Sequence, residues 1–205
     1  MHASKTFALA IAISGLALGG CGGTVDDEGD VDVAESESAI DTCDCPDAVP
    51  PELDPAADQK LKLVLHAEGD QVYGCQATAT GFAWTLIAPD ADLFKLANGK
   101  QVGTHYAGPT WAHKDGSTVV GTRLAGVTVD PTAIPWLLLG AVSHTGNGKM
   151  SDVTTIQRMN TTGGLAPASG CSASSVGAQV AVPYTADYFF YKTGKGKHPP
   201  QCASE

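Results

Sequence analysis

Residues 103–111 have the sequence Gly103-Thr104-His105-Tyr106-Ala107-Gly108-Pro109-Thr110-Trp111, and Asp115-Gly116-Ser117 follows shortly after. A histidine, a tyrosine and a tryptophan thus lie among glycines and a proline, residues that give turns a defined backbone geometry. We expect Asp115-Gly116-Ser117 to form a tight turn between two short strands. The rings of the first segment would then be held at defined angles, as in the wall of a binding site.

The chain around this stretch has the pattern of an all-β domain. Short segments of apolar residues alternate with Gly and Pro, and no long segment has a helical period. The expected strands are 60–65, 72–75, 82–86, 101–106, 110–114, 117–127, 136–139, 153–160, 178–182 and 188–191. Residues 90–97, after Pro89, are expected to form a helical turn or short helix. The pattern predicts a single antiparallel sandwich or barrel with at most one or two short helices.

The N-terminus has the pattern of an export signal. Lys5 precedes an apolar run, residues 7–18, which is shorter than the roughly 20 residues of a spanning helix. Leu18-Gly19-Gly20-Cys21 resembles a bacterial lipobox, in which the cysteine becomes lipid-modified and N-terminal. We therefore expect residues 1–20 to be a lipoprotein-type signal peptide and Cys21 to anchor the protein to a membrane. The alternative is ordinary signal cleavage, with this cysteine left as a free or paired thiol.

The position after the lipobox cysteine bears on the final location. In lipoproteins an aspartate there often favours retention in the inner membrane, and this chain has Gly22 instead. By this resemblance the sequence predicts a location in the cell envelope, at the outer membrane or cell surface.

Residues 21–54 are expected to form an acidic, disordered tether. Twelve of the 22 acidic residues lie in 22–54, which contains no Lys or Arg and few large apolar side chains. The domain expected over 55–205 has eleven basic and ten acidic residues, so the net charge of −10 belongs to the tether. A nearly neutral domain lacks the basic face of a nucleic-acid binder, and we expect no nucleic-acid partner.

Five cysteines follow the lipobox, and export permits them to form disulfides. The first choice is Cys75 with Cys171, because both lie inside the predicted domain. Cys202 could then pair with Cys43 or Cys45, but the connectivity cannot be deduced from the sequence.

Several segments of the domain resemble one known family. They are, in order, 73–75, 105–111, 115–117, 134–139, 156–158, 162–164 and 183–191. Together they resemble the domain of unknown function 3455, a secreted family of bacteria and fungi, over about residues 61–191. The resemblance implies no settled activity.

The sequence contains candidate binding residues but no catalytic motif. A nucleophile elbow, a His-Glu-x-x-His segment and a phosphate-binding loop are all missing from the sequence, so no catalytic residue is assigned. The candidate ligand-binding residues are His105, Trp111, Asp115, Arg158 and Tyr184. We expect His105 and Trp111 at the rim of a pocket, Arg158 in its floor and Tyr106 in the core.

Charged and metal-binding groups leave alternatives open. An inward-facing Arg158 needs a carboxylate partner, which Asp187 or Asp115 could supply. His105, His113 and His144, with Asp115 as an optional fourth ligand, could bind a metal, but they lack a recognisable ligand spacing. We therefore assign no metal and no cofactor.

The sequence predicts a lipid-anchored, extracytoplasmic domain that binds an unknown small molecule or glycan. One alternative is a small enzyme, a hydrolase or metal-dependent enzyme that uses His105 and Asp115, and another is a structural envelope protein. A pocket lined by His105, Asp115 and Arg158 would favour chemistry, whereas a flat aromatic face would favour binding.

Overall fold

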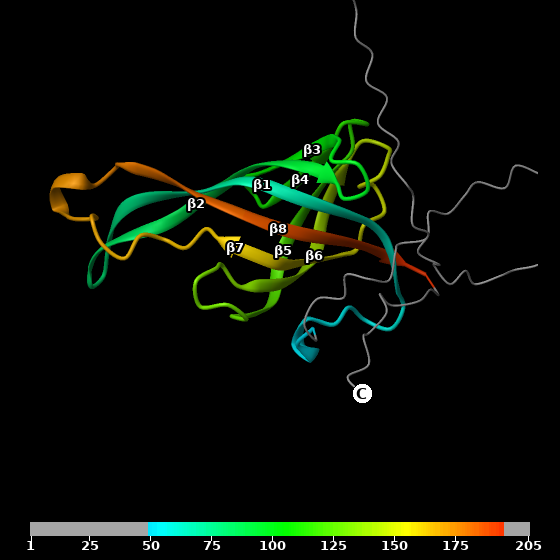
Figure 1. The fold of residues 1–205 in the computed structure, drawn as a ribbon, viewed down its shortest axis with the longest axis horizontal. Coiled ribbons are helices and arrows are strands. Elements are labelled where there is room, and N and C mark those ends of the chain that lie inside the picture. Colours follow the sequence, from blue (N-terminus) through cyan, green and yellow to red (C-terminus); the bar gives the residue numbers. More distant parts are fainter. Residues whose placement is uncertain (1–48, 195–205) are drawn as a thin grey trace, which may run out of the picture. The chain divides into compact units, whose positions relative to one another are not determined.

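A computed structural model describes residues 49–194 of the chain. Eight antiparallel strands each pair with the next strand in sequence, and the last pairs with the first to close a barrel (Figure 1). Its elements are η1 (Pro51–Leu53), β1 (Gln59–Thr78), β2 (Gly81–Lys95), β3 (Gln101–Tyr106), β4 (Thr110–His113), β5 (Thr118–Val127), β6 (Trp136–Thr145), β7 (Thr155–Gly163), η2 (Ala173–Ser175) and β8 (Gln179–Thr193). The all-β prediction is confirmed, and of its two architectures the protein has the barrel.

Several strands are longer than the sequence pattern indicated. Segments 60–65 and 72–75 belong to the single strand β1. Segments 178–182 and 188–191 both belong to β8, except for residue 178, which precedes it. The expected helical turn at 90–97 is wrong, because residues up to Lys95 continue β2. Ala91 pairs with Gly69 of β1 and His105 of β3, and this pairing on both sides overrides the local helical pattern. No helix within residues 49–194 is long and apolar enough to cross a membrane.

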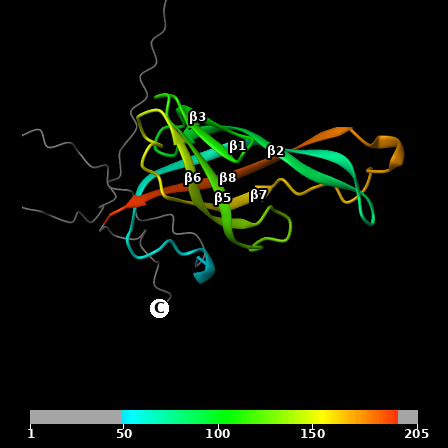
Figure 2. The ribbon, with the colours of Figure 1, turned by 180° about the vertical axis from the view of Figure 1, so that it is seen from behind.

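The end of β1, the start of β2 and the start of β8 extend beyond the other strands as an arm, which both ribbon views show (Figures 1 and 2). A disulfide between Cys75 and Cys171 joins β1 to the segment before β8. The predicted pairing of these two cysteines is therefore confirmed. The Trp84 indole of β2 also donates a hydrogen bond to the Ser169 carbonyl at 2.8 Å. Cys43, Cys45 and Cys202 lie outside the described residues.

The apolar core fills the end of the barrel that contains the β4–β5 turn. Inward side chains alternate along each strand, and Leu65, Leu93, Ile156 and Phe190 are fully buried among them. The loop between β6 and β7 closes this end, because its Met150 and Val153 are also fully buried in the core. The opposite end, which contains the β3–β4 turn, is left to more polar inward residues.

The segment before β1 packs on the outside of the barrel. Leu53 is fully buried against Trp136 of β6 and Met159 of β7, which point outward from the barrel. The Gln157 side chain donates a hydrogen bond to the Leu53 carbonyl at 2.7 Å and so fixes the segment. Residues 49–54, which the sequence assigned to the tether, therefore belong to the packed domain. The rest of the predicted tether, the signal peptide and Cys21 lie outside the described residues.

The contact of Leu53 gives a test of this packing. Leu53→Ala should lower the free energy of unfolding by about 2–4 kcal/mol, because it leaves a cavity beneath Trp136 and Met159. The matched change Leu96→Ala, at a side chain that is 58% exposed, should alter it by less than ~0.5 kcal/mol. Urea denaturation measures both values, and equal effects of the two variants would contradict the packing of the N-terminal segment.

Candidate functional site

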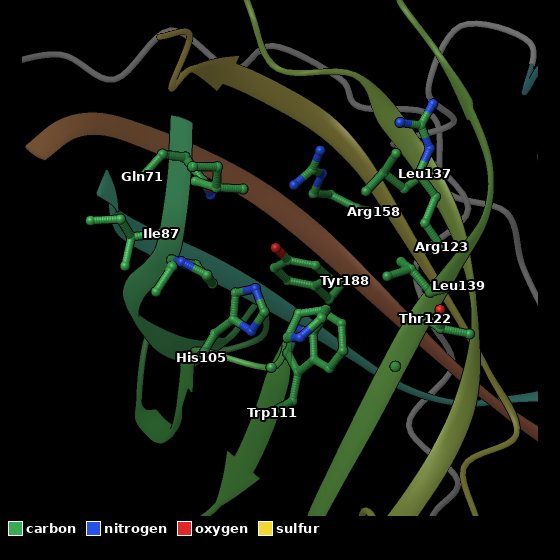
Figure 3. A pocket seen from close by; sticks show the side chains of 16 residues that line it. Gln71, Ile87, His105, Trp111, Thr122, Arg123, Leu137, Leu139, Arg158 and Tyr188 are labelled. Carbon is green, nitrogen blue, oxygen red and sulfur yellow. The ribbon is translucent and has the colours of Figure 1, made fainter. Parts of the chain in front are cut away.

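A cavity of about 400 Å³ occupies the barrel interior near the β3–β4 turn (Figure 3). This volume lies in the range of small-molecule sites, roughly 300–1,000 Å³. All eight strands of the barrel contribute at least one lining residue. The residue from β4 is Trp111, and the residue from β8 is Tyr188. The closed sheet therefore positions the site, since the inward residues of all eight strands converge on one space.

A stacked pair of rings forms one wall of the cavity. His105 of β3 lies directly opposite Trp111 of β4, and their ring centroids are 4.4 Å apart with an interplanar angle of 11°. Tyr188 of β8 meets both rings edge-on, at 5.1 Å from His105 and 5.3 Å from Trp111. Gly121 of β5 makes room for this arrangement, because a Cβ atom there would lie 3.0 Å from the Trp111 ring.

The positions of these rings differ from the sequence prediction. His105 and Trp111 are 2% and 1% exposed, so they lie in the wall of the cavity rather than at its rim. Tyr106, predicted to be in the core, is 42% exposed. Alternation along β3 explains the reversal, because consecutive residues of a strand point to opposite faces and His105 points inward.

His105 is a neutral histidine of defined tautomer. Its Nδ1 atom lies 2.9 Å from the Thr110 carbonyl oxygen, which can only accept, so we assign the ring proton to Nδ1. Burial lowers the pKa of His105 to about 3, the Thr110 carbonyl opposes this change, and the positive charge of Arg158 adds to it. The ring is therefore uncharged at neutral pH, and it is a weak base.

Arg158 of β7 points into the barrel without an acidic partner. Its Nε and Nη2 atoms both donate to the Pro135 carbonyl, at 3.1 and 2.8 Å, which fixes the direction of the guanidinium. The predicted ion pair is wrong, because within residues 49–194 Arg158 makes no salt bridge. Asp187, on the outward face of β8, instead lies 2.7 Å from His66 and accepts a hydrogen bond from Asn160.

Buried polar groups without partners cluster around this arginine. In the described part of the chain, four buried side-chain atoms lack a hydrogen bond: Gln71 Nε2, Trp111 Nε1, Tyr184 Oη and Tyr188 Oη. Gln71, Trp111 and Tyr188 line the cavity, whereas Tyr184 is a buried residue of β8 outside the lining set. Burial raises the pKa of both tyrosines, and Arg158 partly offsets the rise, so both phenols are protonated at neutral pH. Gln71 and the two hydroxyls lie near one another and near Arg158, but without the geometry of a hydrogen bond. Buried polar groups are normally paired, so four atoms left unpaired among the described residues and close to one cavity are unusual for a folded interior.

A family model described as "Protein of unknown function (DUF3455)" matches residues 55–192. The chain belongs to this family. The match confirms the resemblance seen in the sequence, and it covers every strand of the DUF3455 barrel from β1 to all but the last residue of β8. Comparison with curated proteins and with solved structures found no significant match.

Asp115 lies outside the cavity of this DUF3455 domain, in the predicted tight turn between β4 and β5. Desolvation acts to raise its pKa, but hydrogen bonds from the Ser117 hydroxyl and from the Lys149 and Ser117 amides lower it overall. Asp115 thus joins the turn to the β6–β7 loop. Its assignment to the site is corrected, because the turn belongs to the opposite end of the barrel.

The three histidines considered as metal ligands lie at opposite ends of the barrel. His113 lies 3.0 Å from Asp115, and the Nε2 atom of His144 lies 2.6 Å from the Val153 carbonyl oxygen, both near the closed end. His105 faces the cavity. The described residues of the DUF3455 domain contain no group of three or more His, Cys, Asp or Glu side chains that could hold a metal ion.

Sequence reasoning named three residues that the cavity brings together and missed others. His105, Trp111 and Arg158 line it. Gln71 was not considered, and Tyr188 was one of several aromatic candidates but was not assigned to the site. For Gln71 a signal did exist, because it has the same parity as the inward residues Leu65 and Ala67 of β1 and is polar. That signal becomes readable only when β1 is recognised as one long strand.

The buried neutral His105 gives the DUF3455 domain a specific pH dependence. Because the folded state resists protonation of this ring, the unfolded state binds more protons below its ordinary pKa, and stability falls as the pH falls. Between about pH 6.5 and 5 the wild type should lose about 1.5 kcal/mol more unfolding free energy than His105→Gln does. Parallel slopes for the two proteins in denaturation at these pH values would contradict the burial of an uncharged histidine.

Proposed function

We propose that this protein is a lipid-anchored, extracytoplasmic binding protein that holds a small molecule inside its barrel. The observation that carries the proposal is the cavity of about 400 Å³, where three lining residues have buried polar atoms without a hydrogen-bond partner in the described residues. Such groups destabilise the empty protein, and a ligand that pairs with them removes this cost. The disulfide between Cys75 and Cys171 supports an oxidising compartment.

The same geometry gives less support to an enzyme. His105 and Asp115, the pair that a hydrolase would use, lie toward opposite ends of the barrel. Among the described residues that line the cavity there is no Ser, Cys, Asp or Glu, the commonest nucleophiles and carboxylate bases. His105, the one histidine in the lining, has a pKa of about 3, well below the value suited to a general base at neutral pH.

The apolar part of the wall favours a small molecule with an apolar body over a glycan. Leu137 and Leu139 of β6, Ile87 and Pro89 of β2 and Pro109 of the β3–β4 turn supply most of it. Ile87 is 46% exposed while it lines the cavity, so it lies where the cavity meets solvent. Ligand sites of this kind combine an apolar wall with a few placed polar groups.

Binding inside the barrel can be tested with the neutral fluorescent dye N-phenyl-1-naphthylamine. We expect saturable binding of one dye per chain, and Ile87→Trp should weaken it by about tenfold or more because the larger ring narrows the entrance. The control Leu124→Trp makes a matched change at an exposed leucine outside the lining and should bind as the wild type does.

The dye experiment uses the full chain with Cys21→Ser, so that no acyl chain takes up the dye. Dye fluorescence that never saturates would overturn the proposal of a binding cavity. Equal affinities of the two tryptophan variants would overturn the placement of the ligand inside the barrel.

The lipid anchor is tested by the same cysteine variant. Cys21→Ser should move the protein from the membrane fraction to a soluble exported or unprocessed form, because the acyl chains supply the membrane affinity. Fractionation followed by immunoblotting measures the distribution. A processed variant that still partitions with membranes as the wild type does would show that the lipobox assignment is wrong.

A further inference from the structure

We propose that the ligand of the barrel is an organic carboxylate. Its carboxyl group binds to Arg158, and its apolar body lies against the apolar part of the cavity wall. This inference rests on the proposed binding function and adds the chemical class of the ligand. It depends on three features of the cavity: an arginine without a counterion, unpaired hydrogen-bond donors near it, and a lining without acidic residues.

The arginine supplies the charge. Arg158 projects from β7 into the barrel and makes no ion pair within residues 49–194. Its two hydrogen bonds to Pro135 use Nε and one hydrogen of Nη2, so Nη1 and the second hydrogen of Nη2 remain for a ligand that binds beside the nearby Tyr188 hydroxyl. A partly buried charge without a counterion is unfavourable, so an anion that enters the cavity gains a strong charge-assisted interaction.

The unpaired groups add donors rather than acceptors. Gln71 Nε2 and Trp111 Nε1 can only donate, and the protonated Tyr188 hydroxyl can donate as well. Tyr188 lies directly opposite Arg158 in the β7–β8 pair, and cross-strand neighbours of this kind have Cβ atoms about 5 Å apart. In Figure 3 the Arg158 guanidinium, the Gln71 amide and the Tyr188 hydroxyl are directed toward the same space. A carboxylate matches this set, because both of its oxygens only accept.

The remaining lining selects against other charges. Of the described lining residues two are arginines, Arg158 and the exposed Arg123, and none is acidic. A cationic ligand would be repelled, and a neutral one would leave the charge of Arg158 unpaired. With a single partly buried arginine and neutral donors around it, the site suits a monoanion with a planar pair of oxygens, which a guanidinium binds in a bidentate manner.

The experiment compares ligands that share a body and differ in their polar head. The probes are octanoate, 1-octanol and octylamine, together with 1-naphthoate, 1-naphthol and the cationic 1-naphthylmethylamine. Isothermal titration calorimetry on the full chain carrying Cys21→Ser gives each dissociation constant at neutral pH. In the wild-type background at least one acid should bind about tenfold or more tightly than its alcohol, and the amine should bind most weakly.

Variants then assign the preference to the arginine. Arg158→Met should reduce the ratio of acid to alcohol affinity to about one, and Arg158→Lys should restore part of the preference. Lys114→Met removes one positive charge from an exposed side chain outside the lining and should keep the wild-type ratio. Thermal melting checks that each variant is folded, and the comparison of head groups needs no variant at Arg158.

The outcomes separate the two proposals. If alcohols bind as tightly as acids, or if the dye binds and none of the six probes does, the carboxylate assignment is overturned and the binding barrel stands. An acid preference that survives in folded Arg158→Met also overturns it. If neither the dye nor any probe binds, both proposals fall.

Discussion

Pairing of β8 with β1, from Gln59 opposite Thr193 to Gly74 opposite Gln179, closes the sheet on itself. Once the sheet is closed, every strand has one face toward a common interior, and the parity of each residue decides whether it lies inside. Tyr184, Ala186, Tyr188 and Phe190 share the inward parity of β8, and Ile156 and Arg158 share that of β7. The composition of the interior, apolar at one end and polar at the other, follows from this closure.

The polar end of the barrel contains groups that are costly to bury. An arginine without a counterion and four buried polar atoms without partners occur in a described domain whose other buried side chains are mostly apolar or hydrogen-bonded. Apolar replacements of similar volume would relieve the cost of unpaired buried groups. Such a concentration of unfavourable groups around one cavity supports the proposed binding function.

Local patterns in the sequence were sufficient for some features and insufficient for others. Turn chemistry was enough to predict the turn at Asp115-Gly116-Ser117, where Gly116 has a φ of 87°, and cysteine placement was enough for the pair Cys75–Cys171. The sequence did not show which residues of the stretch 103–111 face the barrel interior. His105 and Tyr106 are both aromatic, and only one of two consecutive strand residues can face inward. The partner of Arg158 was unpredictable as well, because the Pro135 carbonyl is brought to it by the pairing of β6 with β7.

The β6–β7 loop closes one end of the barrel with Met150 and Val153, and the cavity lies toward the other end. If a ligand binds there as proposed, the packed loop blocks its exit at that end of the barrel. Replacement of one ligand by another is then dissociative, and its rate depends on the departure of the first molecule rather than on the concentration of the second. The lifetime of such a complex would be set by its dissociation rate constant.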